Sequence, residues 1–410
     1  MTIDDFLATT RRPNMPTLPE LVYEYEKLYA SIIAVSPPLI REVTPTLRIV
    51  NTLNKQTQLI PIRGQYYLVH DQYLGQTLNL LTKYFALSAP IAYARAMGLR
   101  LVSEAATCCG RLDLATYFAV AYSVAQYKAK NQDIPEAGEQ WQKRSNATSV
   151  QEAFVIAHEM AHLVWRTARF DPTVIDWLLE FLVHEDQGDV DQSVEDYLND
   201  LSFLYSEGEI VQENIKTKQD REVINAKVRA KLRQRFIEDG PKQVRANARL
   251  RQNALFREEV YADYAAAQTC VELFQDKMDW TDLMIAIHLA LENITTMSMI
   301  TQHAYRIFSI EFQLNPLAVA ARKRALRRAL EHWPQERSPE QPHLGHSILT
   351  KANRRYMRFI RDPITIDLAG RLSVESLPKL DDLRDTREAM LRAYPESVDP
   401  QYIIRHILFK

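Results

Sequence analysis

Two histidines four residues apart, with a glutamate directly after the first, stand in the apolar stretch AFVIAHEMAHLVW at 153–165. Residues i and i+4 of an α-helix project from one face, so His158 and His162 can both offer an imidazole nitrogen to one metal ion. On such a helix Glu159 points away from the ion, where it can hold a water molecule and take its proton. The spacing predicts a zinc site with Glu159 as the general base.

Apolar neighbours on the same helical face strengthen this interpretation. They would keep the two imidazoles from water, and a buried neutral histidine needs a partner, which a metal supplies. The alternative is a pair of ordinary core histidines whose nitrogens bond to protein groups. The neighbours in question are Phe154, Val155, Ala161 and Trp165.

A catalytic zinc needs a third protein ligand, and the stretch LFREEVYADYAAAQTCVELF at 255–274 offers one. Glu259 lies there among small apolar residues, and we expect its carboxylate to bind the metal. Asp263, one turn later, is expected to accept a hydrogen bond from a ligating histidine. Glu258 is the alternative ligand, and a solvent-facing pair of glutamates is the other alternative. Weaker ligand candidates are Glu180, His184 and Glu185.

The two segments together, HEMAH at 158–162 and EVYAD at 259–263, resemble the gluzincin pattern, in which HExxH is completed by a downstream Glu-x-x-[Ala/Ser]-Asp helix. The resemblance covers these two helices. It implies zinc held by His158, His162 and Glu259, with Glu159 as base and Asp263 as the partner of a ligating histidine. The metzincin pattern is excluded, because it needs Gly and His where this chain has Trp165 and Ala168.

The chain length, the start of the chain and YYLVHDQYLGQTLNLL at 66–81 are similar to bacterial cytoplasmic phage-exclusion peptidases of the Lit type. This resemblance implies an intracellular protease for phage defence, restrained until an infection signal or a regulatory protein partner arrives.

Zincin peptidases also use a donor for the oxyanion that forms on the scissile carbonyl. His343 and His346, which follow a loop rich in proline, are the candidates for this role, and ordinary surface histidines are the alternative. We expect His288 and His303 to be core residues, and Cys270 to be a packing residue.

The helix that carries HExxH is expected to begin at the capping box of Ser149 and Glu152, after a connecting loop over 130–148. It should end before Asp171 and Pro172, which begin a second helix that ends before Gly188.

The chain has only 10 glycines in 410 residues, which favours a mainly α (α+β) protein with a zincin-like core. Two β-like runs around Arg63-Gly64 predict a small N-terminal hairpin or sheet within 46–71. We expect three regions: an N-terminal one over 1–130, a catalytic core over 149–330 with a helical insertion at 186–252, and a C-terminal one over 331–410 that completes the fold.

The charge balance of 50 basic and 52 acidic residues calls for no nucleic acid or membrane partner. The basic stretch 216–251 nearly lacks aromatic residues, so solvated helix faces are expected there. Apolar stretches at 114–127 and 283–300 are expected to be buried helices. Three cysteines without CxxC spacing, and an acidic N-terminus without a signal-peptide pattern, predict a cytoplasmic protein.

The sequence thus predicts a zinc metallopeptidase, a hydrolase acting on a protein or peptide substrate. The alternative is a metal-stabilised regulatory or interaction protein, in which the zinc is structural and the basic helical segment binds a partner. A structural site is closed by four protein ligands, and His184, Glu185 or Glu258 would supply the fourth.

Overall fold

The computed structural model describes residues 1–10, 15–130, 138–184, 248–307, 316–337 and 344–364, and single positions between 223 and 234. The chain divides into two compact units. The main unit combines Met1–Arg169 with Tyr261–Lys410, and the small unit is Phe170–Val260. The described residues are mostly helical with one three-stranded sheet, so the mainly α class is confirmed.

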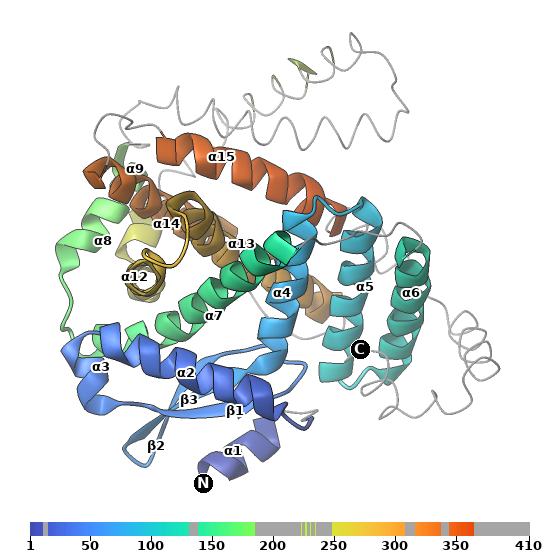
Figure 1. Ribbon diagram of the computed structural model, residues 1–410, viewed down its shortest axis with the longest axis horizontal. Coiled ribbons are helices and arrows are strands. Elements are labelled where there is room, and N and C mark those ends of the chain that lie inside the picture. Colours follow the sequence, from blue (N-terminus) through green and yellow to red (C-terminus); the bar gives the residue numbers. More distant parts are fainter. Residues whose placement is uncertain are drawn as a thin grey trace. The chain divides into compact units, whose positions relative to one another are not determined.

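The sheet has the strand order β1-β3-β2, in which β1 (Thr46–Val50) is parallel and β2 (Gln58–Ile62) antiparallel to the central β3 (Gln65–Asp71). The predicted hairpin is confirmed. Its two central residues, Arg63 and Gly64, have φ values of 50° and 80°, the two positive values of a type I′ turn, which suits the twist of a hairpin. Because the strand order is β1-β3-β2, β2 is an edge strand of this sheet (Figure 1).

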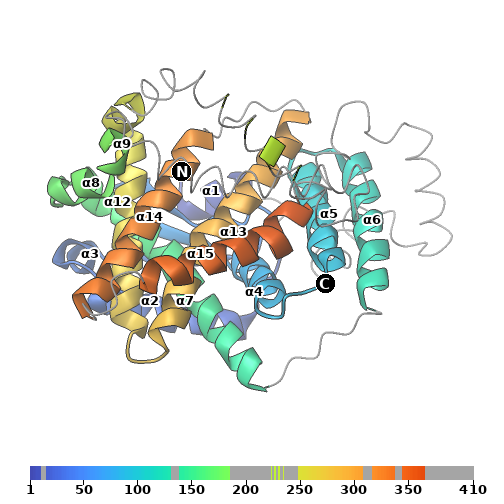
Figure 2. The ribbon, with the colours of Figure 1, turned by 90° about the horizontal axis from the view of Figure 1, so that it is seen from above.

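Helix α7 (Gly138–Arg166) is the central element of the main unit. It contacts α13 and α4 along much of its length, and it also contacts α2, α3, β2 and β3. In Figure 1 it runs between the sheet with α2 on one side and α13 to α15 on the other, and Figure 2 shows the latter three from above. The other helices of the main unit are α1 (Ile3–Thr10), α2 (Pro19–Val35), α3 (Pro38–Val43), α4 (Gln72–Ala86), α5 (Ile91–Cys108), α6 (Leu112–Lys130), α13 (Trp280–Ile307), α14 (Pro316–Arg337) and α15 (Leu344–Tyr356), which continues as a π-helix, η1 (Met357–Arg361).

The predicted start of α7 is wrong. The helix begins at Gly138, eleven residues before Ser149, so residues 138–148 are helical and not a loop. The polar side chains of these first turns are bonded to a neighbouring helix: Arg144 donates to Asn79 of α4, and the Thr148 hydroxyl lies 3.2 Å from the same oxygen. These tertiary contacts stabilise a polar segment that by composition resembles a loop.

Glu152 consequently lies within the helix and is not a capping residue. Its Oε1 accepts a hydrogen bond of 2.6 Å from the Tyr25 hydroxyl of α2. Burial raises the pKa of Glu152 to about 7, although the bond from Tyr25 acts in the opposite direction. Gly75 of α4 leaves room for the pair, because a Cβ atom there would collide with both side-chain oxygens.

A buried ionic cluster joins the segment between β1 and β2 to α5. The Glu104 carboxylate accepts from Lys55 Nζ at 2.7 Å and from Arg100 Nε at 2.8 Å, and the Tyr73 hydroxyl also donates to it. The Glu104 side chain is fully buried, while the Lys55 and Arg100 side chains are 7% and 8% exposed. The ion pairs thus offset the free-energy cost of burying the three charged groups.

One described helix is apolar and long enough to cross a membrane by length and composition alone, over Trp280–Thr301 of α13. Within the structure 78% of that window is buried, as expected for the apolar stretch at 283–300. The location of the protein in the cell stays a prediction.

In the small unit, α8 (Pro172–Leu178) begins as predicted. The Asp171 side chain accepts from the Thr173 backbone N–H at 2.9 Å, and Pro172 occupies the first turn. The expected single helix is wrong, however, because the chain turns at Leu179 and resumes as α9 (Phe181–His184). Leu178 and Leu179 at this turn are both buried. Most of the predicted 186–252 insertion, and the chain beyond 364, lie outside the described residues.

Candidate metal centre

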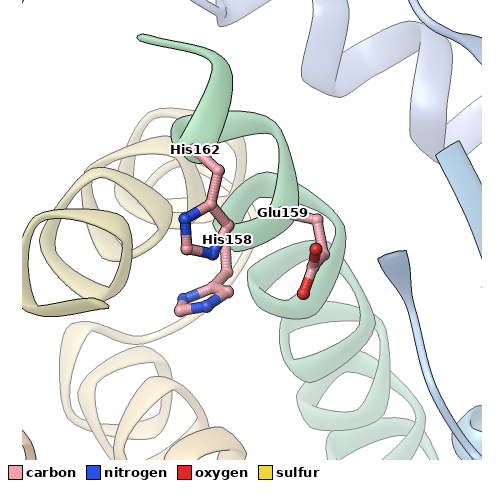
Figure 3. A group of neighbouring side chains, drawn as sticks. All are labelled: His158, Glu159 and His162. Carbon is pink, nitrogen blue, oxygen red and sulfur yellow. The ribbon is translucent and has the colours of Figure 1, made fainter. Parts of the chain in front are cut away.

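His158, Glu159 and His162 come together on α7 as the sequence predicts. Each offers one ligand atom, and these atoms lie within 4.8 Å of one another. The imidazole centroids are 5.0 Å apart with nearly perpendicular rings. Figure 3 shows both rings on one side of the helix and Glu159 leaving it on a neighbouring side. Two imidazoles beside a carboxylate form a donor set that suits zinc.

The site is shielded from water without being closed. His162 is 8% exposed, and the His158 side chain is 13% exposed. Phe154, one turn before His158, is fully buried and its ring lies roughly parallel to the imidazole, with the two centroids 6.4 Å apart. Low polarity around the imidazoles strengthens their interaction with any cation that binds there.

Asp263 of α12 (Ala254–Phe274) lies against His158, with Oδ1 3.0 Å from Nδ1. An ionised carboxylate can only accept, so this contact favours the tautomer of His158 that carries its hydrogen on Nδ1. In that tautomer the lone pair is on Nε2, which makes Nε2 the nitrogen able to coordinate a metal. The contact expected for Asp263 is thus present, while its role toward a metal stays a prediction.

Arg322 of α14 binds the same carboxylate with a two-pronged contact, from Nε to Oδ2 and from Nη2 to Oδ1, each at 2.9 Å. Asp263 is only 1% exposed. Burial by itself would raise its pKa, but the Arg322 guanidinium and the bond from His158 outweigh burial and hold the pKa of Asp263 below its ordinary value. Asp263 is therefore an ionised group at neutral pH.

Glu159 lies at the edge of the sheet. Its Oε2 accepts a hydrogen bond of 3.2 Å from the backbone N–H of Leu59, on the edge strand β2. Leu59 is paired with Leu68 of β3, and since its N–H donates to Glu159, that N–H points away from β3. The outer edge of β2 therefore contacts Glu159 at Leu59.

The part of α12 that belongs to the main unit reaches α7 at two further points. The Tyr261 and Trp165 rings are 5.9 Å apart, and the Cys270 thiol lies 3.5 Å from the Val150 carbonyl oxygen. Cys270 is fully buried, as expected of a packing residue. Of the small residues near it on α12, Ala262, Ala266 and Ala267 are fully buried and Ala265 is partly buried.

The other expected ligands stay predictions. Glu258 and Glu259 are partly buried on the first turns of α12, which belong to the small unit, and Glu180 is exposed at the turn before α9. The side chain of His184, and all of Glu185, lie outside the described residues.

The histidines expected outside the metal site differ in outcome. His343 lies outside the described residues. His346 is exposed on α15, with Nδ1 3.1 Å from Glu331 of α14, and its oxyanion role stays a prediction. His288 is buried in α13, as expected of a core residue, and burial lowers its pKa to about 4. His303 is in the same helix, but its side chain is outside the described residues.

Two groups that contact the candidate site escape sequence reasoning. Leu59 acts through its backbone N–H, for which no side-chain signal exists. Arg322 stands in the basic run RKRALRR at 322–328, whose composition is typical of a solvated helix face. Only the position of α14 next to α12 distinguishes Arg322 from its neighbours.

Comparison with known proteins finds no match: no protein-family model, no curated protein and no solved structure resembles this chain.

Proposed function

We propose that this protein is a zinc-dependent peptidase that hydrolyses a peptide bond in a protein or peptide substrate. One observation carries the proposal: the ligand atoms of His158, Glu159 and His162 lie within 4.8 Å of one another, with Asp263 Oδ1 3.0 Å from His158 Nδ1. A zincin-like core, with Glu259 as the third ligand, is part of this proposal.

Each residue has a distinct role. His158, through Nε2, and His162 hold the metal, and Asp263 keeps His158 in the tautomer that coordinates. A bound zinc ion polarises the scissile carbonyl. Glu159 takes a proton from the attacking water molecule and delivers it to the leaving nitrogen. The hydrogen bond from Leu59 fixes one carboxylate oxygen of Glu159 against the sheet and so orients the group.

The gluzincin resemblance of the two helices supports a peptide as the substrate. On the sheet side of Glu159 lies the edge strand β2, whose Leu59 N–H binds this carboxylate. By the phage-exclusion resemblance, this protease is cytoplasmic and held inactive until a partner protein arrives.

The test compares wild type with Glu159→Gln and His162→Ala. We measure bound zinc by elemental analysis, and proteolysis with an unfolded protein as substrate. The Gln variant keeps the shape and both imidazoles, so it should retain zinc, yet it cannot take a proton and should lose about 10²- to 10⁴-fold in rate. The Ala variant should lose both zinc and activity.

Two results would contradict the proposal. Proteolysis by Glu159→Gln at the wild-type rate would exclude Glu159 as the base. Zinc retained by all three proteins at equal affinity would exclude the histidine pair as its ligands. Zinc that depends on His162, in a protein that cleaves no substrate with or without a partner, would instead favour a structural site.

A further inference from the structure

The environment of Asp263 extends beyond the histidine that it contacts. Among the described residues, its side-chain partners are His158 on α7 and Arg322 on α14. Oδ1 lies 3.0 Å from His158 Nδ1 and accepts from Arg322 Nη2 at 2.9 Å. Oδ2 accepts from Arg322 Nε at 2.9 Å. Three helices therefore meet at one buried carboxylate.

The geometry of this contact restricts the carboxylate. A guanidinium is a planar fork whose two N–H groups match the two oxygens of a carboxylate, so the pair has one preferred plane and one orientation. With both oxygens held by Arg322, Oδ1 stays beside His158 Nδ1, 3.0 Å away. Without the fork, the carboxylate can turn about its Cβ–Cγ bond and move away from that nitrogen.

We propose that Arg322 is a positioning residue for the metal centre, holding Asp263 so that His158 keeps the tautomer and ring orientation needed to coordinate zinc. This inference rests on the proposed metal site. Arg322 touches neither the metal nor the substrate and acts through two intervening groups. Hydrogen-bond partners of ligating histidines commonly change metal affinity by about 10- to 100-fold when removed. We expect a similar change in zinc affinity when Arg322, the partner of that partner, is removed.

The adjacent residue of the same helix provides a matched control. Lys323 Nζ binds the buried Glu292 carboxylate of α13 at 2.6 Å. Arg322 and Lys323 thus each pair a cation of α14 with a buried carboxylate on another helix, and both cations are mostly covered, at 24% and 15% side-chain exposure. Of the two carboxylates, only Asp263, the partner of Arg322, contacts His158. Loss of either pair should weaken the packing of α14, but only loss of the Arg322–Asp263 pair should lower the affinity for zinc.

The experiment measures zinc affinity by competition with a chromophoric chelator and thermal stability of the metal-free protein by circular dichroism. Arg322→Met should lower zinc affinity by about 10- to 100-fold. Arg322→Lys, which restores one donor and the charge but no fork, should recover part of the loss. Lys323→Met should lower thermal stability and leave zinc affinity at the wild-type value.

Several results would overturn the inference. Wild-type zinc affinity in Arg322→Met would show that Asp263 needs no second partner. Equal loss of affinity in Arg322→Met and Lys323→Met would show a general effect of α14 packing. Both outcomes differ from failure of the metal site itself, in which wild type would bind zinc no better than His162→Ala.

Discussion

Removal of the Glu104 carboxylate should destabilise the protein more than most single substitutions. In the wild-type protein this fully buried group bonds to two cations, Lys55 at 2.7 Å and Arg100 at 2.8 Å. The two cations lower the pKa of Glu104 more than burial raises it, so the group is ionised in the folded state. Glu104→Ala leaves both buried cations without this carboxylate, and only neutral acceptors remain to them in the cluster, the Leu53 carbonyl for Lys55 and the Tyr73 hydroxyl for Arg100.

The magnitude follows from the number of buried ion pairs that are broken. Breaking one buried ion pair by removing one member costs about 3–5 kcal/mol. Here one substitution breaks two pairs, and it also removes the acceptor of the Tyr73 hydroxyl. We therefore expect a loss at the upper end of that range, about 5 kcal/mol, which is a large part of a typical domain stability of about 5–15 kcal/mol.

Urea denaturation followed by far-UV circular dichroism gives the free energy of unfolding for wild type and variant. Asp113→Asn is the control, since it breaks an ion pair with Arg111 whose side chains are 46% and 45% exposed. An exposed pair of this kind contributes about 0–1 kcal/mol. A loss for Glu104→Ala no larger than that of the control would refute the conclusion that the buried cations depend on Glu104.

Two further predictions concern the Tyr25–Glu152 pair. Ala replacing Gly within a helix normally stabilises a protein by about 1 kcal/mol. Gly75→Ala should instead destabilise by about 1–3 kcal/mol, because its Cβ would collide with both oxygens of the pair. Gly138→Ala, which has open space around it, should show no loss of stability in urea denaturation. Glu152 has a pKa of about 7 in the folded protein against 4.5 when unfolded, so the folded state holds the proton more tightly. The contribution of Glu152 to stability should be complete below pH 4.5 and fall by up to about 3 kcal/mol as the pH rises to 7. Glu152→Gln cannot ionise and should lack this decline, and parallel stability profiles of the two proteins over that range would contradict the assignment.

Apart from the contact of Asp263 with His158 on another helix, the parts of the structure that the sequence predicts correctly are local. The hairpin follows from two residues, since Arg63-Gly64 accepts the positive φ values of a tight turn. The start of α8 follows from Asp171 and Pro172, which act within one helical turn. The capping box at Ser149 is an equally local signal, yet it is wrong for α7. Contacts with Asn79, 65 and 69 residues away in sequence, extend the helix past it.

By itself the sequence determined that His158, Glu159 and His162 share one stretch of helix, because helical periodicity converts their spacing directly into positions in space. Tertiary structure alone decided which groups surround them: the N–H of Leu59, a hundred residues earlier in the chain, and the Arg322 fork on Asp263, 59 residues apart. Such contacts depend on which helix packs beside which strand, and the free energy of that packing is spread over many side chains without a motif of its own.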